Sequence, residues 1–152
     1  MNKFFYFFIL LGIISGCTKS PEKRVVQAYP SGNPKVVRYF EKDGSKEKMV
    51  KEEVFYENKR LQYSGEFKDS LRNGHWVYYY ENGNPWSEGD FKNGLSDGMR
   101  KTYFENGKLR YEGGYKAGKM SGIWKFYHET GKLDKEVNAD TIHDPQKLVP
   151  SS

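Results

Sequence analysis

Three consecutive stretches of the sequence repeat one another: residues 65–88 read GEFKDSLRNGHWVYYYENGNPWSE, residues 89–112 read GDFKNGLSDGMRKTYFENGKLRYE, and residues 113–136 read GGYKAGKMSGIWKFYHETGKLDKE. Equivalent residues recur every 24 positions. A unit this short cannot bury an apolar face alone, so each copy must gain its core by stacking on its neighbours. Partial copies extend further back, which predicts one repeat domain over residues 29–137.

Glycines and the residues before them predict two turns in each copy. Asn-Gly and Asp-Gly steps favour tight hairpin turns because these residues adopt positive φ at low cost. One turn is predicted at Asn73-Gly74, Asp97-Gly98 and Ser121-Gly122, and the other at Asn82-Gly83, Asn106-Gly107 and Thr130-Gly131. The chain is therefore predicted to be all-β, an elongated array of antiparallel β-hairpins. Lys59 replaces a glycine of the second turn, so that turn is expected to be strained or of another type.

Apolar and charged residues alternate along the first strand of each copy, which predicts one covered and one solvated face. The covered face is predicted to hold Leu61, Tyr63, Gly65 and Phe67, with their equivalents Pro85, Ser87, Gly89, Phe91, Leu109, Tyr111, Gly113 and Tyr115. The three glycines are expected to leave room for a ring from the neighbouring strand. Trp86 falls on the charged face, where we consider it a candidate contact residue.

Tyrosine occupies one position of the second strand in every copy, as Tyr79, Tyr103 and Tyr127. These residues are expected to form a ladder along the sheet, one rung per repeat. Such a stripe could be a platform for sugars, peptides or lipid headgroups, but regularly spaced rings more often form the core. We therefore interpret the tyrosines as structural, together with the turn glycines Gly74, Gly98, Gly122, Gly83, Gly107 and Gly131.

The sequence contains no pattern that predicts catalysis, a metal site or a cofactor. The three histidines, His75, His128 and His143, are not spaced as metal ligands. The repeated carboxylates are expected to pair with Lys or Arg across strands; they are Glu81, Glu105, Glu129, Glu88, Glu112 and Glu136. No nucleophile elbow, phosphate loop or EF-hand spacing is present. A hydrolase that uses a glutamate pair on envelope polysaccharide is the weakest hypothesis.

The first sixteen residues are predicted to be a signal peptide. Lys3 precedes an apolar run over residues 4–14, which is shorter than the roughly 20 residues that span a bilayer. The run ends in Ile14-Ser15-Gly16-Cys17, which resembles the lipobox of bacterial lipoproteins, where the cysteine is acylated after the preceding peptide is removed. Cys17 is the only cysteine, so it cannot form a disulfide within the chain. An uncleaved apolar anchor or an ordinary secretory signal is the alternative.

Lipidation at Cys17 predicts a location in the cell envelope, on the outer membrane or a periplasm-facing membrane, with the lipid bilayer as a partner. Residues 17–28 are then predicted to be the lipidated N-terminus and a flexible stalk, and residues 138–152 a disordered tail. The net charge is +5, but acidic and basic residues are interspersed. We interpret them as a solvated face and predict no nucleic-acid partner.

The repeat resembles the MORN repeat, in the variant form found in bacterial proteins. The resemblance covers residues 52–136 well and is carried by G-x-F/Y-K, a later G-x-W, a paired aromatic, E-N-G-K-L and a closing Y-E. Arg100 departs from the pattern because it replaces the expected tryptophan. The resemblance implies a single-layer twisted sheet of stacked hairpins, used as a scaffold and as a protein or membrane contact module. Some bacterial relatives carry the label of YwqK-type antitoxin.

Two hypotheses about function result. The first is a membrane-tethered, non-enzymatic scaffold that binds a protein or an envelope polymer along its sheet. The second is an antitoxin or immunity-like inhibitor that neutralises a partner protein by direct binding.

Overall fold

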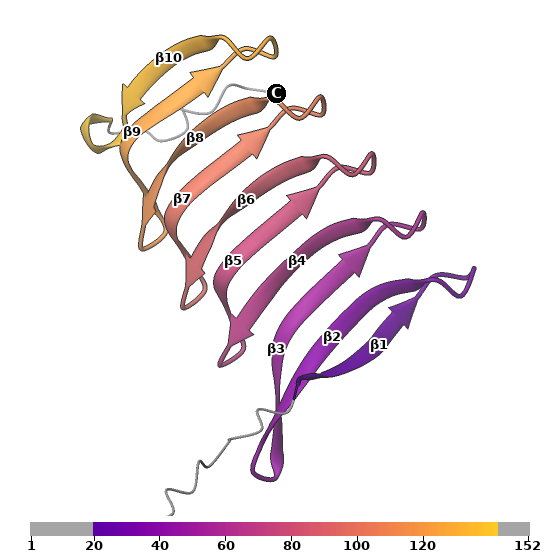
Figure 1. Cartoon of the computed structure of the whole chain (residues 1–152). Coiled ribbons are helices and arrows are strands. Elements are labelled where there is room, and N and C mark those ends of the chain that lie inside the picture. Colours follow the sequence, from indigo (N-terminus) through magenta and orange to yellow (C-terminus); the bar gives the residue numbers. More distant parts are fainter. Residues whose placement is uncertain (1–19, 143–152) are drawn as a thin grey trace, which may run out of the picture.

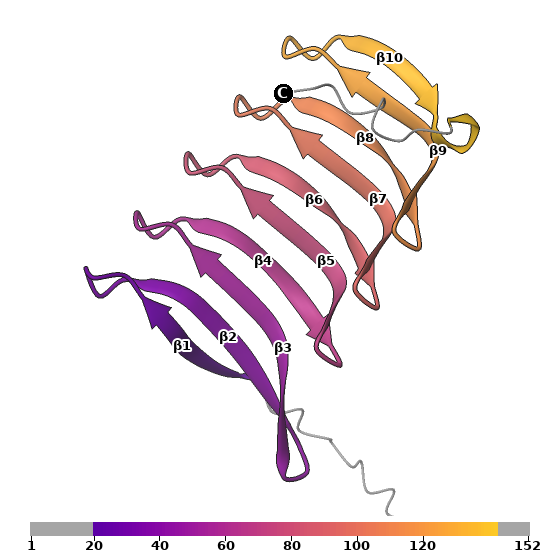
Figure 2. The same cartoon turned by 180° about the vertical axis from the view of Figure 1, so that it is seen from behind.

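A single antiparallel sheet makes up nearly all of the computed structural model, which describes residues 20–142 (Figure 1). Its strands are β1 (Glu22–Ala28), β2 (Pro34–Asp43), β3 (Lys46–Phe55), β4 (Leu61–Lys68), β5 (Leu71–Tyr79), β6 (Pro85–Lys92), β7 (Leu95–Tyr103), β8 (Leu109–Lys116), β9 (Lys119–Tyr127) and β10 (Leu133–Asn138), followed by the short 3-10 helix η1 (Ala139–Thr141). Each strand pairs with its neighbours in the sequence, so the sheet is open and runs in chain order from β1 to β10. The view from behind shows the same single layer (Figure 2). The predicted all-β hairpin array is confirmed.

The second predicted turn is confirmed in every copy. The loop after β5 shows its geometry: the Tyr80 N–H donates to the Asn84 carbonyl at 2.8 Å, and the Gly83 N–H donates to the Tyr80 carbonyl at 2.9 Å. The loop after β3 is the same turn, because the Lys59 N–H donates to the Tyr56 carbonyl at 3.0 Å. Lys59 adopts φ +69°, a left-handed conformation that costs a residue with a Cβ roughly 1–2 kcal/mol. Of the two alternatives predicted for this turn, strain is therefore correct.

The first predicted turn is wrong in position. Asn73-Gly74, Asp97-Gly98 and Ser121-Gly122 lie inside β5, β7 and β9. The chain instead reverses at Asp69-Ser70, Asn93-Gly94 and Ala117-Gly118, where both residues of each pair have positive φ, as a two-residue hairpin loop of the favoured twist requires.

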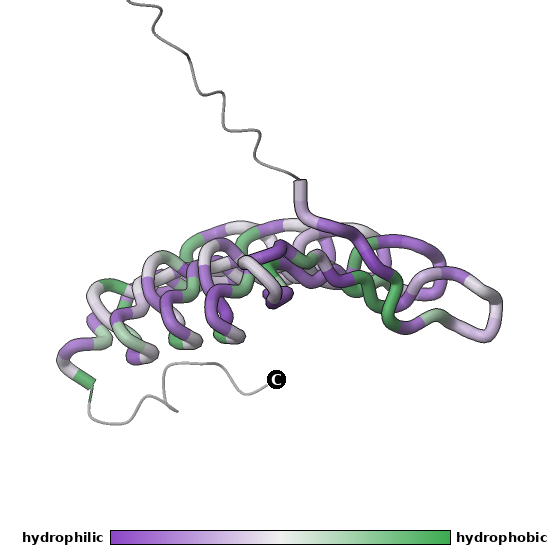
Figure 3. Tube along the Cα trace, turned by 90° about the horizontal axis from the view of Figure 1, so that it is seen from below, coloured by the Kyte–Doolittle hydropathy of each residue, from purple (hydrophilic) through white to green (hydrophobic). Residues whose placement is uncertain are grey.

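The interior glycines Gly74, Gly98 and Gly122 also have positive φ, but they belong to β-bulges. Opposite β5, for example, Gly65 pairs with Trp76 while the next residue, Glu66, pairs with Asn73. Two residues of β5 are therefore extra, and a bulge of this kind bends and twists the strand that contains it. The sheet is accordingly curved, and hydrophilic and hydrophobic residues alternate along its trace (Figure 3).

The larger part of the core lies on one face of the sheet, which we call the ring face, and its centres are Trp76 and Trp124, while buried Val37 pairs with Glu53 on the other face. Each of the two tryptophan side chains is 1% exposed. Trp76 lies over Gly65 and Trp124 over Gly113, so closely that a Cβ on either glycine would overlap the indole ring. The expected room for a ring is thus confirmed at two of the three glycines. At the third, Gly89, the opposite residue is Arg100.

The ends of the repeat domain differ from the predicted boundaries. Residues 22–28 of the predicted stalk form β1, which pairs with β2. At the other end, η1 follows β10 directly, and Ala139 and Ile142 pack against the core around Trp124, so the ordered chain continues into the predicted tail. Cys17, the predicted signal peptide and His143 lie outside the described residues. Within residues 20–142, no helix has the length and apolar character needed to cross a membrane.

Candidate binding site in the middle of the sheet

The middle repeat replaces large rings on the ring face with smaller or polar side chains. Arg100 stands where the outer repeats have Trp76 and Trp124. Thr102 likewise replaces the rings of Tyr78 and Phe126, and Ser87 replaces those of Tyr63 and Tyr111. In the outer repeats these positions form ring clusters, such as Tyr63 stacked on Trp76 at 6.0 Å between centroids. The three middle residues, Ser87, Arg100 and Thr102, cannot fill the same space, so the core is interrupted there.

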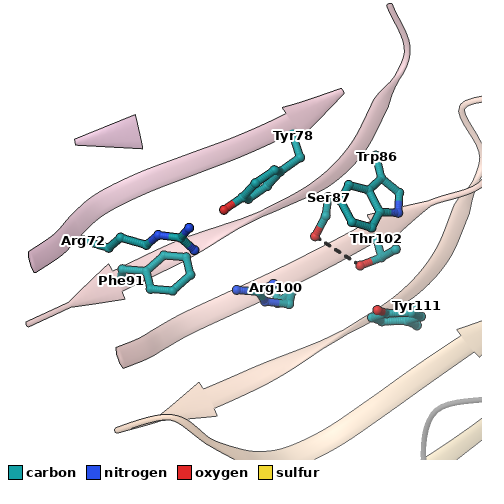
Figure 4. Close-up of a pocket in the computed structure, with 8 residues that line it drawn as sticks. All are labelled: Arg72, Tyr78, Trp86, Ser87, Phe91, Arg100, Thr102 and Tyr111. Carbon is teal, nitrogen blue, oxygen red and sulfur yellow. Dashed lines mark hydrogen bonds between the residues drawn. The ribbon is translucent and has the colours of Figure 1, made fainter. Parts of the chain in front are cut away.

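A hollow of about 310 Å³ occupies this place between the two ring clusters (Figure 4). Its lining comes from four adjacent strands, β5 to β8, and consists of Arg72, Tyr78, Trp86, Ser87, Phe91, Arg100, Thr102 and Tyr111. The volume is near the lower end of the range typical of small ligand sites, about 300–1,000 Å³.

Two buried hydroxyl groups, those of Ser87 and Thr102, line the hollow where β6 pairs with β7. They lie 3.3 Å apart and share a hydrogen bond, and the Ser87 hydroxyl also donates to the Lys101 carbonyl at 3.2 Å. The two residues are 6% and 3% exposed, and both are satisfied by neighbours in the sheet. The two hydroxyl groups therefore make part of the hollow's wall polar, and each of them already has a hydrogen-bond partner in the sheet.

Two arginines place positive charge in the hollow, one on either side of the Phe91 ring. The Arg72 guanidinium lies 4.4 Å from the Trp76 ring centroid and 5.5 Å from that of Phe91. The Arg100 guanidinium lies 5.5 Å from the Phe91 centroid and 5.4 Å from that of Tyr115. Stacking on rings fixes both guanidinium planes and leaves their N–H edges available for hydrogen bonds.

Arg100 is incompletely satisfied. Its Nη2 donates to the Ser96 hydroxyl at 3.1 Å. Its Nε is buried, and it has no hydrogen-bond partner among the described residues. None of the eight residues that line the hollow is acidic, so the lining offers these two cations no carboxylate.

Trp86 lies at the edge of the hollow and not on the charged face where the period-two pattern placed it. In the register of β5 and β6, Tyr78 pairs with Ser87 and Tyr79 with Pro85, so Trp86 is the extra residue of a bulge. The bulge turns its ring toward Tyr78, edge to face at 5.8 Å, and toward Tyr80 at 6.4 Å. The predicted face is wrong. Trp86 is nevertheless 46% exposed, which leaves it accessible for the predicted contact role.

The repeated tyrosines Tyr79, Tyr103 and Tyr127 each end a strand at the same position of their repeat, as expected. Tyr103 follows Thr102, which lines the hollow, so the tyrosine projects to the opposite face. There the Tyr103 hydroxyl donates to Glu88 at 2.5 Å and the Tyr127 hydroxyl to Glu112 at 2.9 Å. The core interpretation is therefore wrong for Tyr103 and Tyr127, which are half-buried on the polar face.

The repeated carboxylates have three kinds of partner. Glu136 pairs with Lys125 at 3.4 Å, as expected for a cross-strand ion pair. Glu88 and Glu112 instead accept the tyrosine hydroxyl bonds, and Glu88 also lies 3.4 Å from His75. Burial, aided by the bond to Glu88, raises the pKa of Tyr103 well above its usual value. No set of three His, Cys, Asp or Glu side chains within residues 20–142 is arranged to hold a metal ion.

The remaining glutamates, Glu81, Glu105 and Glu129, lie in the turns, where asparagines link one repeat to the next. The Asn82 amide donates to the Glu105 carbonyl at 3.1 Å, and the Asn106 amide donates to the Glu129 carbonyl at 3.1 Å. Asn58 makes the same bond to Glu81. A preference for positive φ alone does not predict this ladder; the signal for it in the sequence is the 24-residue spacing of the asparagines.

Three consecutive segments of the chain match the family described as MORN repeat variant: residues 72–93, 96–117 and 120–140. Each segment begins with β5, β7 or β9 and continues through the glycine turn into the next strand. Residues 72–140 form a MORN repeat variant domain. No curated protein matches the chain in sequence.

MORN repeats generally serve as protein-binding scaffolds. The hollow lies between the first two MORN segments: Arg72, Trp86 and Phe91 belong to the first, and Arg100 and Tyr111 to the second. Strands β1 to β4 precede the matched segments and extend the same sheet beyond the MORN domain.

Proposed function

We propose that this chain is a membrane-tethered, non-enzymatic scaffold that binds a partner protein on the ring face of its sheet, at the hollow between β5 and β8. The observation that supports the proposal is the interrupted core of the middle repeat, which leaves exposed Trp86 beside an open, partly apolar surface. Exposed aromatic residues beside arginines are the usual anchors of protein interfaces.

The binding face can be tested with a photo-crosslinking amino acid placed at Trp86 in living cells. A matched control places it at Lys125, which alternates with buried Trp124 and Phe126 and therefore projects from the other face. We expect a discrete crosslinked protein from position 86 that is absent from position 125. Equal crosslinking at both positions, or none at position 86, would contradict the proposal. A partner whose toxic activity this chain blocks would instead make it an antitoxin-like inhibitor.

Attachment to the membrane through acylated Cys17 is the second part of the proposal. It rests on the lipobox-like Ile14-Ser15-Gly16-Cys17 and on the short distance along the chain from Cys17 to β1, which begins at Glu22. Strands lie about 4.8 Å apart, so the hollow would be about 20–30 Å from the tethered edge.

The tether can be tested by fractionating cells that express wild type or Cys17→Ser. We expect wild type in the membrane fraction, labelled by a fatty-acid probe, and the variant in the soluble fraction without label. A variant that stays with membranes would show that lipidation does not hold the protein there.

A further inference from the structure

The hollow has a charge and shape that select a particular ligand, and the inference drawn from them rests on the proposed scaffold function. We propose that it recognises a carboxylate side chain, presented two residues from an aromatic side chain on an extended, acidic segment of the partner protein. The carboxylate binds to the Arg100 guanidinium, within the positive field of Arg72, and the aromatic ring packs against Trp86 and Tyr78.

The two arginines repel each other in the free protein and are not neutralised by the lining. Both guanidiniums lie 5.5 Å from the centroid of the same ring, Phe91, and none of the lining residues is acidic. An anion bound at Arg100 is attracted to both guanidiniums and offsets their repulsion. Two arginines near the start of the sheet are paired: Arg38 bonds Glu52 at 2.7 Å, and Arg24 bonds Glu47 at 2.7 Å. The hollow therefore brings two arginines without a carboxylate partner to a single ring, Phe91.

Arg100 supplies a second, independent reason for an anionic ligand. A buried donor without a partner is costly, and Arg100 Nε is such a donor within residues 20–142. A carboxylate accepts two parallel bonds from a guanidinium, so a ligand that turns the Nε edge of Arg100 toward the hollow satisfies Nε and also neutralises the charge. In the outer repeats the same position holds buried Trp76 and Trp124, which need no ligand.

The walls of the hollow favour a peptide over a simple ion. Tyr78, Trp86 and Tyr111 provide ring faces next to the cations, and the Ser87 and Thr102 hydroxyls lie between them. On an extended peptide, side chains two residues apart project to the same side, about 6.5–7 Å from each other. One of them can reach the arginines while the other covers Trp86. Strands β5 to β8 thus present separate places for a charged and an aromatic side chain.

The test uses the full chain in uncharged detergent micelles and two peptides, acetyl-Gly-Phe-Gly-Glu-Gly-amide and the same peptide with Gln in place of Glu. NMR follows the arginine Nε–H and tryptophan indole N–H signals during titration. We expect saturable shifts at Arg100 and Trp86 with the Glu peptide, and binding weaker by about tenfold or more with the Gln peptide. Binding should also weaken as salt is raised.

Two variants make the result specific to the hollow. Arg100→Gln should weaken binding of the Glu peptide by about tenfold or more. Arg100→Trp restores the residue of the outer repeats, so it should fold and lose binding. Arg60→Gln is the matched control, since Arg60 is exposed in a turn and donates to the Glu81 carbonyl; it should bind as wild type does.

Three outcomes would overturn the inference. Equal affinity for the Glu and Gln peptides would exclude carboxylate recognition. Unchanged binding by Arg100→Gln would place the peptide elsewhere. Shifts at Arg100 with inorganic phosphate or phosphatidylglycerol vesicles, but not with the Glu peptide, would assign the hollow to a phosphate group. If crosslinking at Trp86 still captures a partner protein in these cases, the scaffold function stands and only the carboxylate recognition is wrong.

Discussion

At the scale of single residues, three glycines at one position of the repeat have different roles. Gly65 and Gly113 lie under Trp76 and Trp124, whereas Gly89 lies opposite Arg100. A Cβ on Gly89 would meet the Met99 carbonyl oxygen at 3.3 Å, a tight but adjustable contact. Identical spacing in the sequence therefore predicts the position of these glycines, while the residue on the next strand determines what each one does.

Alanine at these glycines should give unequal losses of stability. We expect Gly65→Ala and Gly113→Ala to lower the free energy of unfolding by roughly 1–3 kcal/mol, because the new methyl group displaces a buried indole. Gly89→Ala, the matched control, should change it by less than about 1 kcal/mol. Urea unfolding followed by tryptophan fluorescence measures all three. Equal losses at the three positions would mean that the indoles do not lie over the glycines.

The strained turn at Lys59 offers a stabilising substitution. Lys59→Gly should raise the free energy of unfolding by about 0.5–1 kcal/mol, because glycine adopts positive φ without steric cost. The reverse exchange, Gly83→Lys, should lower it by a similar amount, since Gly83 has φ +95° in the equivalent turn. Thermal and urea unfolding of both variants provide the check. Destabilisation by Lys59→Gly would show that the lysine side chain contributes more than its backbone strain costs.

Tyr63 should contribute to the loss of stability at alkaline pH. Burial, together with its hydrogen bond to Glu52 at 2.9 Å, raises the pKa of Tyr63 to about 12, whereas an unfolded tyrosine titrates near 10. The stabilisation is complete below about pH 10 and is lost as the pH rises toward 12, because the unfolded chain releases this proton first. Urea midpoints between pH 9 and 11 should therefore fall less steeply for Tyr63→Phe than for wild type. Identical slopes would contradict the assignment.

At the scale of elements, the turns carry the contacts that hold successive hairpins in register. Asn82 uses its side-chain oxygen to accept from the Asn84 N–H within its own turn, and its amide to donate to Glu105 of the next repeat. Thr130 takes the asparagine position in the last copy, and its hydroxyl accepts a long bond of 3.5 Å from the Lys132 N–H. The asparagine thus serves both the turn and the stacking of repeats.

Loss of one asparagine should weaken both contacts. We expect Asn82→Ala to lower the free energy of unfolding by about 1–2 kcal/mol, since it removes two hydrogen bonds of ordinary strength. Asn82→Asp retains the acceptor but not the donor and should lose about half as much. Hydrogen exchange at Asn84 and Glu105 would separate the two effects. An Asn82→Asp variant as unstable as Asn82→Ala would show that the bond between repeats dominates.

The hairpins and the central site differ in how far the sequence predicts them. Period-two alternation and the Asn82-Gly83 type of turn predict the strands well because both are local signals. Asn73-Gly74 has the same sequence as a hairpin turn, but it lies in a bulge of β5. Only the pairing register of β5 with β4 distinguishes the bulge from a turn. A bulge likewise turns Trp86 to the other face. The hollow requires three substitutions on neighbouring strands, of which only Arg100 departs from the repeat pattern clearly enough to be recognised in the sequence.

At the scale of the whole molecule, the strict 24-residue period predicts that a repeat can be removed. Deletion of residues 89–112 joins Glu88 to Gly113, which is the equivalent of Gly89 in the next repeat. The repeat pattern continues unbroken across the junction, so an eight-stranded sheet should form. The m value, which is the slope of unfolding free energy against urea concentration, should fall by roughly a fifth, because the shorter chain exposes less surface on unfolding. Circular dichroism should still report β structure. Deletion of residues 89–100 instead breaks the period and should prevent folding.

The pairing of every strand with its neighbours in the sequence also determines how the molecule would respond to mechanical load. A lipid at Cys17 and a partner at the hollow would pull on opposite sides of β1 to β4. Those strands would transmit the load across rows of hydrogen bonds, which yield one after another when pulled apart sideways. Strands β1 to β4 would then separate from the sheet while the MORN segments stay folded. The connection between the membrane and the hollow would lengthen under tension, and the partner protein would stay bound.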